Sequence, residues 1–172
     1  MDVRTKPPVS DLPACRLIKP SDACALGRLF ERLRRHGVEE FFHPHPLTQE
    51  AAAELAAYTG KDVYCVVEIA AELVGYGMLR GWDAGYDVPN LGVAIDPGQQ
   101  GRGHGRRLME FLHRLAHQRG AKRIRLSVYP ENVRAVALYQ SLGYSLNFKR
   151  EPDGQVVGFL ELPHAEPSRP GE

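Results

Sequence analysis

The sequence predicts an α/β fold with helices packed on a mixed sheet, and three observations carry this prediction. The chain has 172 residues, which is enough for one domain with a sizeable core. An apolar run at residues 91–95 leads through a glycine-rich loop into an amphipathic helix. The predicted order is a strand and two helices, an antiparallel run of three strands, a strand–helix–strand unit, and a closing hairpin of residues 144–148 and 155–161.

The folded domain is expected at residues 14–162. Residues 1–13 contain three prolines and predict a flexible N-terminal segment, and residues 163–172 predict a flexible polar tail. No apolar run approaches the length of a membrane span, and the first ten residues lack the apolar centre of a signal peptide. A formal net charge of +1 argues against a general nucleic-acid binder. We therefore expect a cytoplasmic protein with no nucleic-acid or membrane partner.

Capping signals and prolines divide the first part of the chain. Residues 15–19 predict the first strand, and Pro20-Ser21-Asp22 offers an N-cap for the helix that follows. Two prolines within residues 41–46 exclude a helix there and predict an extended, rigid loop. Thr48 is expected to cap a second helix at residues 50–58.

The middle of the chain predicts an antiparallel sheet. Residues 63–67 and 73–79 read as paired strands joined by a turn at residues 69–72. Residues 81–89 then form a polar and aromatic connection that is longer than a hairpin requires. The next strand, at residues 91–95, is apolar throughout and therefore predicted to be buried.

The loop Gln100-Gly101-Arg102-Gly103-His104-Gly105 links that strand to the amphipathic helix. Asp96-Pro97-Gly98 ends the strand, and an apolar stripe at helical spacing follows the glycines. Glycines let the backbone approach a ligand, and the N–H groups and dipole of a helix N-terminus favour negative oxygens. The loop predicts a pyrophosphate cradle, although glycines that serve turn geometry alone explain this single motif equally well.

Two common phosphate-binding motifs do not match this loop. No Gly-Lys-Ser/Thr follows, as a P-loop requires. A dinucleotide fold requires an acidic residue about twenty residues downstream, where residues 121–125 are basic instead. Residues 99–125 hold eight Lys or Arg against one acid, Glu110. This excess suits a ligand with several phosphates, and a solvated basic helix face is the alternative.

A second motif follows the strand predicted at residues 123–128. Residues 132–144, Asn-Val-Arg-Ala-Val-Ala-Leu-Tyr-Gln-Ser-Leu-Gly-Tyr, strongly resemble the Asn-x-x-Ala-x-x-Leu-Tyr-x-x-x-Gly-Phe/Tyr signature of the GCN5-related N-acetyltransferases, the GNAT family. Residues 100–105 match that family's Gln/Arg-x-x-Gly-x-Gly/Ala pyrophosphate motif. The two motifs occur in the family's order and at its usual separation. The resemblance covers roughly residues 18–162.

The resemblance implies a twisted central sheet of six to seven strands with about four helices. It implies acetyl-CoA as co-substrate, no metal, and a V-shaped cleft between the strands at residues 91–95 and 123–128. A backbone N–H of Ile95 would polarise the acyl carbonyl, and Tyr139 would be the general acid that protonates the leaving thiolate. The implied cofactor-binding residues are Val93, Ala94, Ile95, Gln100, Gly101, Arg102, Gly103, His104, Gly105, Arg106, Asn132 and Tyr139.

Two of these residues also have a purely structural interpretation. Tyr139 has apolar neighbours on its helix, as a tyrosine that fills the core would have. Asn132 suits the N-cap of the same helix, and that role is compatible with a hydrogen bond to the cofactor.

The general base is not where many members of the family have it. They carry a Glu about five residues before the end of the central strand, where this chain has Asn90. The proton of the amine must then go to water, to Asp83 or Asp87, or to His43 or His45. A histidine is suited to this because it can accept a proton near neutral pH.

The acceptor pocket is predicted from the segments at residues 42–46 and 80–90. Both combine aromatic surface with ionisable groups, and prolines stiffen both. Packing of Trp82 over the sheet edge is an equally good explanation of that residue. We expect acceptor contacts, with Asp83 pairing a cationic amine, from His43, His45, Trp82, Asp83 and Tyr86.

Other histidines and the cysteines predict no chemistry. His113 and His117 are spaced like metal ligands, but they lie on a basic helix face without an acidic neighbour, which indicates exposed surface. Cys15, Cys24 and Cys65 are widely spaced and are expected to be buried free thiols in a reducing compartment.

The main functional hypothesis is an acetyl-CoA-dependent N-acetyltransferase that acts on a primary amine of a small molecule, for example an amino sugar. Acetylation of a protein N-terminus or lysine is a second hypothesis. A non-catalytic acyl-CoA sensor is a third, which the missing strand Glu permits and the intact Tyr139 disfavours. The expected partners are acetyl-CoA and an amine acceptor, and a homodimer is also open.

Overall fold

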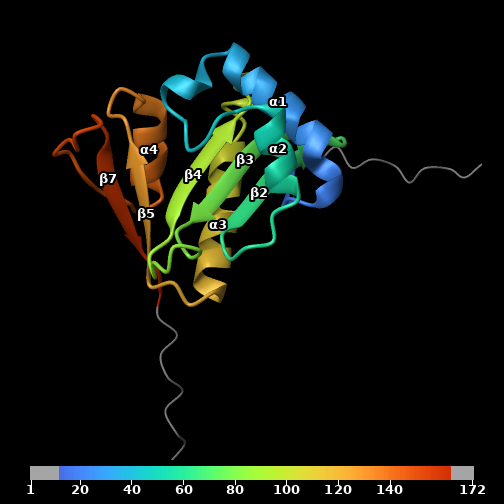
Figure 1. The fold of residues 1–172 in the computed structure, drawn as a ribbon. Helices are drawn as coiled ribbons and strands as arrows, with labels where there is room; N and C mark the ends of the chain where they lie inside the picture. Colours follow the sequence, from blue (N-terminus) through green and yellow to red (C-terminus); the bar gives the residue numbers. More distant parts are fainter. Residues whose placement is uncertain (1–11, 164–172) are drawn as a thin grey trace, which may run out of the picture.

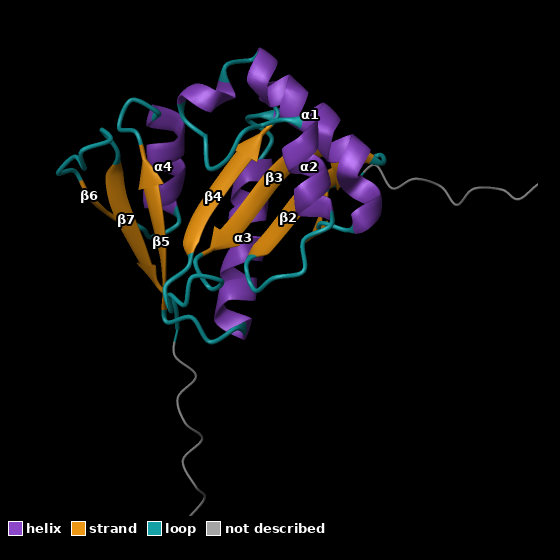
Figure 2. Ribbon diagram, viewed as in Figure 1, coloured by secondary structure: helices purple, strands orange, loops and turns teal. Residues whose placement is uncertain are grey.

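The computed structural model describes residues 12–163, which form one seven-stranded sheet with helices on both faces (Figures 1 and 2). The strands are β1 (Ala14–Leu17), β2 (Val63–Ile69), β3 (Glu72–Arg80), β4 (Asn90–Ile95), β5 (Arg123–Val128), β6 (Ser145–Asn147) and β7 (Val156–Glu161). The α-helices are α1 (Ala23–Arg35), α2 (Gln49–Ala56), α3 (His104–Gln118) and α4 (Val133–Ser141). Three short 3₁₀ helices are η1 (Pro20–Asp22), η2 (Val38–Glu40) and η3 (Pro97–Gln99). The predicted mixed α/β fold is confirmed. The segments expected to be flexible, residues 1–13 and 163–172, fall outside the described residues except for residues 12, 13 and 163.

The sheet splits between β4 and β5. Its order is β1-β2-β3-β4-β5-β7-β6, and every neighbouring pair is antiparallel except β4 and β5, which are parallel. These two strands pair only at their beginnings, where Asn90 lies opposite Arg125 and Leu91 opposite Leu126. Beyond Leu91 they diverge into the V that Figure 1 shows. The later residues of β4 therefore have a strand partner on one side only.

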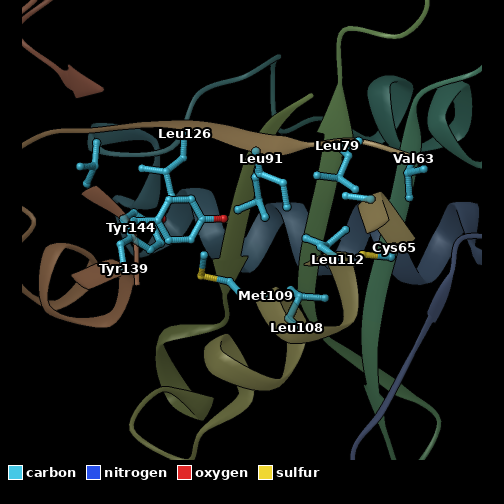
Figure 3. Packing of buried hydrophobic residues seen from close by; sticks show 14 of the residues in the cluster. Val63, Cys65, Leu79, Leu91, Leu108, Met109, Leu112, Leu126, Tyr139 and Tyr144 are labelled. Carbon is cyan, nitrogen blue, oxygen red and sulfur yellow. The ribbon is translucent and has the colours of Figure 1, made fainter. Parts of the chain in front are cut away.

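Two apolar clusters hold the layers together. On one face, α1 buries Leu26, Phe30 and Leu33 in a cluster that includes Tyr76 of β3 and Ala94 of β4. On the other face, the apolar stripe of α3 and residues of α4 pack on the sheet (Figure 3). Each fully buried Leu or Phe side chain contributes about 1.5–3 kcal/mol relative to exposure. The helices therefore fix the strands on both sides of the split.

The helix caps and the cysteines agree only in part with the predictions. Thr48 caps α2 as predicted, because its side chain accepts a hydrogen bond from the N–H of Ala51 at 3.2 Å. The N-cap of α1 lies within Pro20-Ser21-Asp22 as predicted, at Asp22, but the Asp22 carboxylate makes no capping hydrogen bond and binds Arg16 at 2.7 Å instead. Cys65 is buried, but Cys24 is exposed, contrary to the prediction. Among the helices of residues 12–163, none is both long and apolar enough to cross a membrane.

Candidate active site

The loop between β4 and α3 presents a row of unpaired backbone N–H groups. Gly103 is the N-cap of α3, and Arg107 is the first residue whose N–H donates back into the helix, to the Gly103 carbonyl at 3.0 Å. From residue 101 to residue 106, no backbone N–H donates to another described residue. Such donors at a helix N-terminus, together with the helix dipole, form an anion-binding site. The loop thus fits a pyrophosphate through its main chain.

The sequence around this loop explains its shape. Asp96 ends β4 and is fixed from two sides, by Arg32 of α1 at 2.6 Å and by the N–H of Gly98 at 3.1 Å. Gly101 and Gly103 have φ of +76° and +81°, in the left-handed region that favours glycine. A side chain at either position would strain the turn that aligns the N–H groups.

The open edge of β4 leads from this loop into the split. Backbone groups of a strand point alternately to its two neighbours. The Asp96 N–H donates to Val74 of β3, and the Pro89 carbonyl accepts from Arg125 of β5. Val93 and Ile95 therefore direct their backbone groups toward the split, whereas Ala94, opposite Tyr76, directs its own to β3.

Gln100 connects the loop to both walls of the split. Its side chain donates to the Ile95 carbonyl at 3.2 Å and accepts from Arg134 of α4 at 2.7 Å. Because this contact occupies the Ile95 carbonyl, the Ile95 N–H and both backbone groups of Val93 are the groups left for a ligand in the described split.

Tyr139 lies in the core beneath α4 and has a free hydroxyl. The residue is 7 % exposed, and its hydroxyl makes no hydrogen bond with any other described residue. Burial raises the pKa of Tyr139 to about 12. The centroid of its ring lies 5.9 Å from that of Tyr144. Figure 3 shows the two tyrosines next to each other. A buried phenol without a partner is a donor available to a ligand.

His113 supports this pair of tyrosines, which corrects its expected position on exposed surface. Its Nε2 lies 2.8 Å from the Tyr144 hydroxyl, and the ring is half-buried beside that residue. Burial lowers the pKa of His113 to about 4. His117, one turn later, is exposed. Within the described range, no three His, Cys, Asp or Glu side chains gather as metal ligands would.

Two further residues predicted to bind the cofactor lie at helix N-termini. Asn132 caps α4, accepting from the N–H of Ala135 at 3.3 Å, as predicted. His104, the first residue of α3, is 6 % exposed, and neither of its ring nitrogens has a partner in the described structure. Burial and the charges of Arg102 and Arg107 lower its pKa. A neutral His104 ring thus sits within the cradle.

The proline-rich loop at residues 41–47 crosses the split on the face opposite α3 and α4. A Cβ on Gly92 would lie 3.2 Å from the ring of Phe42, so the loop packs on β4 where that strand leaves β5. At its other side, His43 and Phe41 contact the ring of Tyr129, which directly follows β5. The loop thus spans both walls of the V, as the cyan segment does in Figure 1.

The two histidines of this loop differ in their surroundings. His43 is exposed, with Nδ1 2.9 Å from the Glu39 carbonyl and Nε2 3.3 Å from the Tyr129 hydroxyl. Because a carbonyl only accepts, Nδ1 carries the proton and Nε2 of neutral His43 is the basic nitrogen. His45 is half-buried, bonded to Tyr76 at 2.9 Å, and burial lowers its pKa.

Comparison with known proteins places the chain in a family. The model of the acetyltransferase (GNAT) family matches residues 28–144, which is more than half of the chain. The chain belongs to the GNAT family. The predicted resemblance is therefore confirmed.

Individual relatives add the following similarities. The spermine/spermidine N(1)-acetyltransferase of Bacillus subtilis is 33% identical over 99 residues, which cover 53% of this chain and 64% of that protein. The [ribosomal protein bS18]-alanine N-acetyltransferase of Escherichia coli is 42% identical over 53 residues, covering 31% of this chain and 36% of that protein. The chain thus spans less than two thirds of these relatives. A Salmonella typhimurium protein solved with its cofactor acetyl-CoA shares the fold with a TM-score of 0.72 at 20% identity, covering 91% of this chain and 98% of that chain.

In this GNAT protein, the structure places Trp82, Asp83 and Tyr86 away from the split. Trp82 packs with the α3 side of the sheet, and the guanidinium of Arg119, the C-cap of α3, lies 5.0 Å above its ring. The 15 residues of α3 separate this end from the cradle by about 22 Å. Asp83 accepts hydrogen bonds from Tyr58 and from the Lys61 N–H, and Tyr86 is 67% exposed. We therefore leave these three residues out of the proposed acceptor site.

Tyr129 is the residue at this GNAT split that sequence reasoning missed. It follows β5 directly, and His43 is 86 positions away in the chain. The available signal was its position just beyond the carboxyl end of a parallel strand, where ligands bind in open α/β sheets. Nothing in the local sequence indicated which side chain would face it.

Proposed function

We propose that this GNAT protein is an acetyl-CoA-dependent N-acetyltransferase that acts on a primary amine of a small molecule. One observation carries the proposal: the unpaired N–H groups of residues 101–106 continue into the open edge of β4, on the same side of the sheet as the free hydroxyl of Tyr139. Pyrophosphate, pantetheine amides and a leaving thiolate need these groups in this order.

The residues present fit acetyl-CoA, which supplies an activated acyl thioester when bound. The main chain of residues 101–106 would hold the pyrophosphate, and Arg102 and Arg106 add positive charge beside it. The backbone groups of Val93 and the Ile95 N–H would pair with the pantetheine arm and the acyl oxygen, as an added strand pairs with an edge.

Tyr139 is suited to donate a proton to the leaving group. Since burial raises its pKa to about 12, the phenol stays protonated throughout the neutral range. A proton held at this hydroxyl is available where negative charge develops. His113 and Tyr144 hold the ring in place from the side of α3 and β6.

His43 is the residue we propose to accept a proton from the amine. An alkylammonium must lose one proton before its nitrogen can attack, and the unprotonated Nε2 of His43 faces the split beside Tyr129. His45 is less suited, since it is half-buried and its Nε2 accepts at 2.9 Å from the Tyr76 hydroxyl inside the core, whereas His43 is exposed and its contact with the Tyr129 hydroxyl is longer, at 3.3 Å. Asn90 cannot serve as a base, because an amide is not one.

Two measurements on the full chain test the proposal. Calorimetry should detect acetyl-CoA binding that Gly103→Val abolishes, because a β-branched residue is strained at a φ of +81°. Release of free thiol should be measured with acetyl-CoA and a panel of spermine, glucosamine and an N-terminal alanyl peptide.

Turnover with at least one of the two small amines and not with the peptide is the expected result. Turnover of the peptide alone would favour the protein N-terminal alternative. Acetyl-CoA binding without turnover of any amine would favour an acyl-CoA sensor. Unchanged binding by Gly103→Val would place the cofactor elsewhere.

A further inference from the structure

A row of three polar side chains crosses the sheet at the closed end of the V. Arg80, the last residue of β3, lies opposite Asn90, the first residue of β4, and Asn90 lies opposite Arg125 of β5. Neighbouring strands are about 4.8 Å apart, so the two arginine backbones are separated by about 10 Å with a neutral amide between them. We refer to Arg80, Asn90 and Arg125 as the apex row.

The apex row faces the same side as the proline-rich loop. The adjacent residues Leu79, Leu91 and Leu126 belong to the cluster beneath α3, and side chains alternate along a strand. Two contacts agree with this placement. The Arg80 guanidinium donates to the Pro44 carbonyl at 3.0 Å, and Arg125 donates to the Asn90 side-chain oxygen at 3.0 Å.

Neither arginine of the row has a counter-ion within the described part of the chain. Both are half-buried, and no carboxylate of residues 12–163 lies within 4.0 Å of either guanidinium. By contrast, Arg16 and Arg32 are also partly buried, and each binds an aspartate. Each of the two guanidiniums is partly desolvated and bonds only a neutral oxygen. Most of their N–H donors are therefore available to a ligand.

Two carboxylates of the loops next to the end of β3 are engaged by other groups. Asp62 accepts from the backbone N–H groups of Gly81 and Asp83, and Asp83 itself accepts from Tyr58. With no ion pair to either arginine among residues 12–163, the positive charge of the apex row is uncompensated on the side of the sheet that carries the proline-rich loop.

We propose that the apex row binds an anionic group of the acceptor, so that the substrate is an amine that also carries a carboxylate or phosphate. This inference rests on the proposed function and names its substrate class. Guanidinium groups bind carboxylate and phosphate through paired N–H donors, and the Asn90 amide adds donors between them. The same charge disfavours a polycation such as spermine, because two like charges would approach in a partly desolvated site.

Matched amines test the inference by isolating one charge. Glucosamine 6-phosphate and glucosamine differ by a phosphate, and 4-aminobutyrate and butylamine differ by a carboxylate. For at least one pair, the anionic member should have a kcat/KM about tenfold to a hundredfold higher, the range expected for charge-assisted hydrogen bonds. The pair that responds identifies the anion.

Charge-removing variants then locate the effect. Arg125→Gln and Arg80→Gln should each reduce the preference for the anionic member about tenfold and leave kcat/KM for its neutral counterpart nearly unchanged. Arg123→Gln is the matched control, because Arg123 lies on the same face of β5 but is exposed and packs over Phe159. If Arg80 or Arg125 had only a structural role, its substitution would lower kcat/KM for both members of the pair alike.

Calorimetry supplies a readout that is independent of turnover. It measures the affinity of the protein for each amine, in the presence and in the absence of CoA. Absence of acetyl-CoA binding and of any thiol release would refute the proposed function alone, since the anionic probe can still bind the row. Equal affinity and equal kcat/KM within both pairs, or a preference unchanged in Arg125→Gln, would overturn the inference while leaving the acetyltransferase in place.

Discussion

Acid should destabilise this protein partly through His113, the histidine that fixes Tyr144 beside Tyr139. In the folded state burial lowers the pKa of His113 from 6.5 to about 4, and an unfolded chain restores the ordinary value. Between these values the unfolded state binds more protons than the native state, so stability rises with pH across that window. The contribution is complete above pH 6.5 and is lost as pH falls toward 4.

The size of the effect follows from the shift. A difference of about 2.5 pKa units at about 1.36 kcal/mol per unit gives an upper limit of about 3.4 kcal/mol. With pKa values of 6.5 in the unfolded and about 4 in the folded state, the loss of stability amounts to about 2 kcal/mol at pH 5 and about 3 kcal/mol at pH 4. Since His113 is only half-buried, solvent reduces these figures, and we expect about 1–2 kcal/mol at pH 5.

Urea denaturation at pH 7 and at pH 5 measures this loss. His113→Gln keeps a hydrogen-bonding group near the Tyr144 hydroxyl but cannot titrate, so it should lose less stability on acidification than the wild type by the stated amount. Carboxylates titrate in both proteins and cancel in the comparison. His117→Gln, the exposed neighbour one turn later, should behave as the wild type does. Equal losses in wild type and His113→Gln would refute the reasoning.

The remaining predictions concern the site and its support. Tyr139→Phe should lower turnover about a hundredfold with nearly unchanged acetyl-CoA affinity, as kinetics and calorimetry would show; wild-type turnover would remove it from the mechanism. Because the pKa of Tyr139 is about 12, wild-type activity should show no alkaline loss attributable to this phenol up to about pH 10. His43→Gln should lower kcat/KM for an alkylamine about a hundredfold, as loss of a general base does, while His36→Gln, an exposed histidine beyond α1, should leave it unchanged. His45→Ala should cost about 1–3 kcal/mol in denaturant unfolding, because the buried Tyr76 hydroxyl loses its partner.

Periodicity and local motifs predicted most of the fold, including the elements that carry the proposed cofactor site. The strand–loop–helix at residues 91–118 is encoded by contiguous residues: an apolar run, a proline stop, glycines and a helical stripe. Its cradle depends on backbone conformation that Gly101 and Gly103 determine locally. Tyr139 is proposed for the same reason, since its motif is contiguous and lies on one helix.

The acceptor side depends on contacts that sequence spacing does not encode. Trp82 and His43 belong to equally elaborate loops, and only the strand register places one beneath α3 and the other over the split. Asp22 is the N-cap of α1, as its position before a helix predicts, but the sequence does not show that Arg16, brought close by β1, binds its carboxylate. The apex row exists only through pairing of three strands.

A carboxylate introduced into the apex row should reverse its preference. In Asn90→Glu, the new side chain would lie between the guanidiniums of Arg80 and Arg125, because Asn90 is opposite both residues and already bonded to Arg125. Those charges would keep the carboxylate ionised, and it would occupy the donors that otherwise bind the substrate's anion. The kcat/KM ratio within the responding amine pair should therefore fall about tenfold or more, with acetyl-CoA affinity unchanged. Asn90→Asp, one methylene shorter, should show the same direction with a smaller change. An undiminished ratio in Asn90→Glu would mean that the anionic group is recognised away from this row, since a site already holding a carboxylate cannot bind a second one equally well.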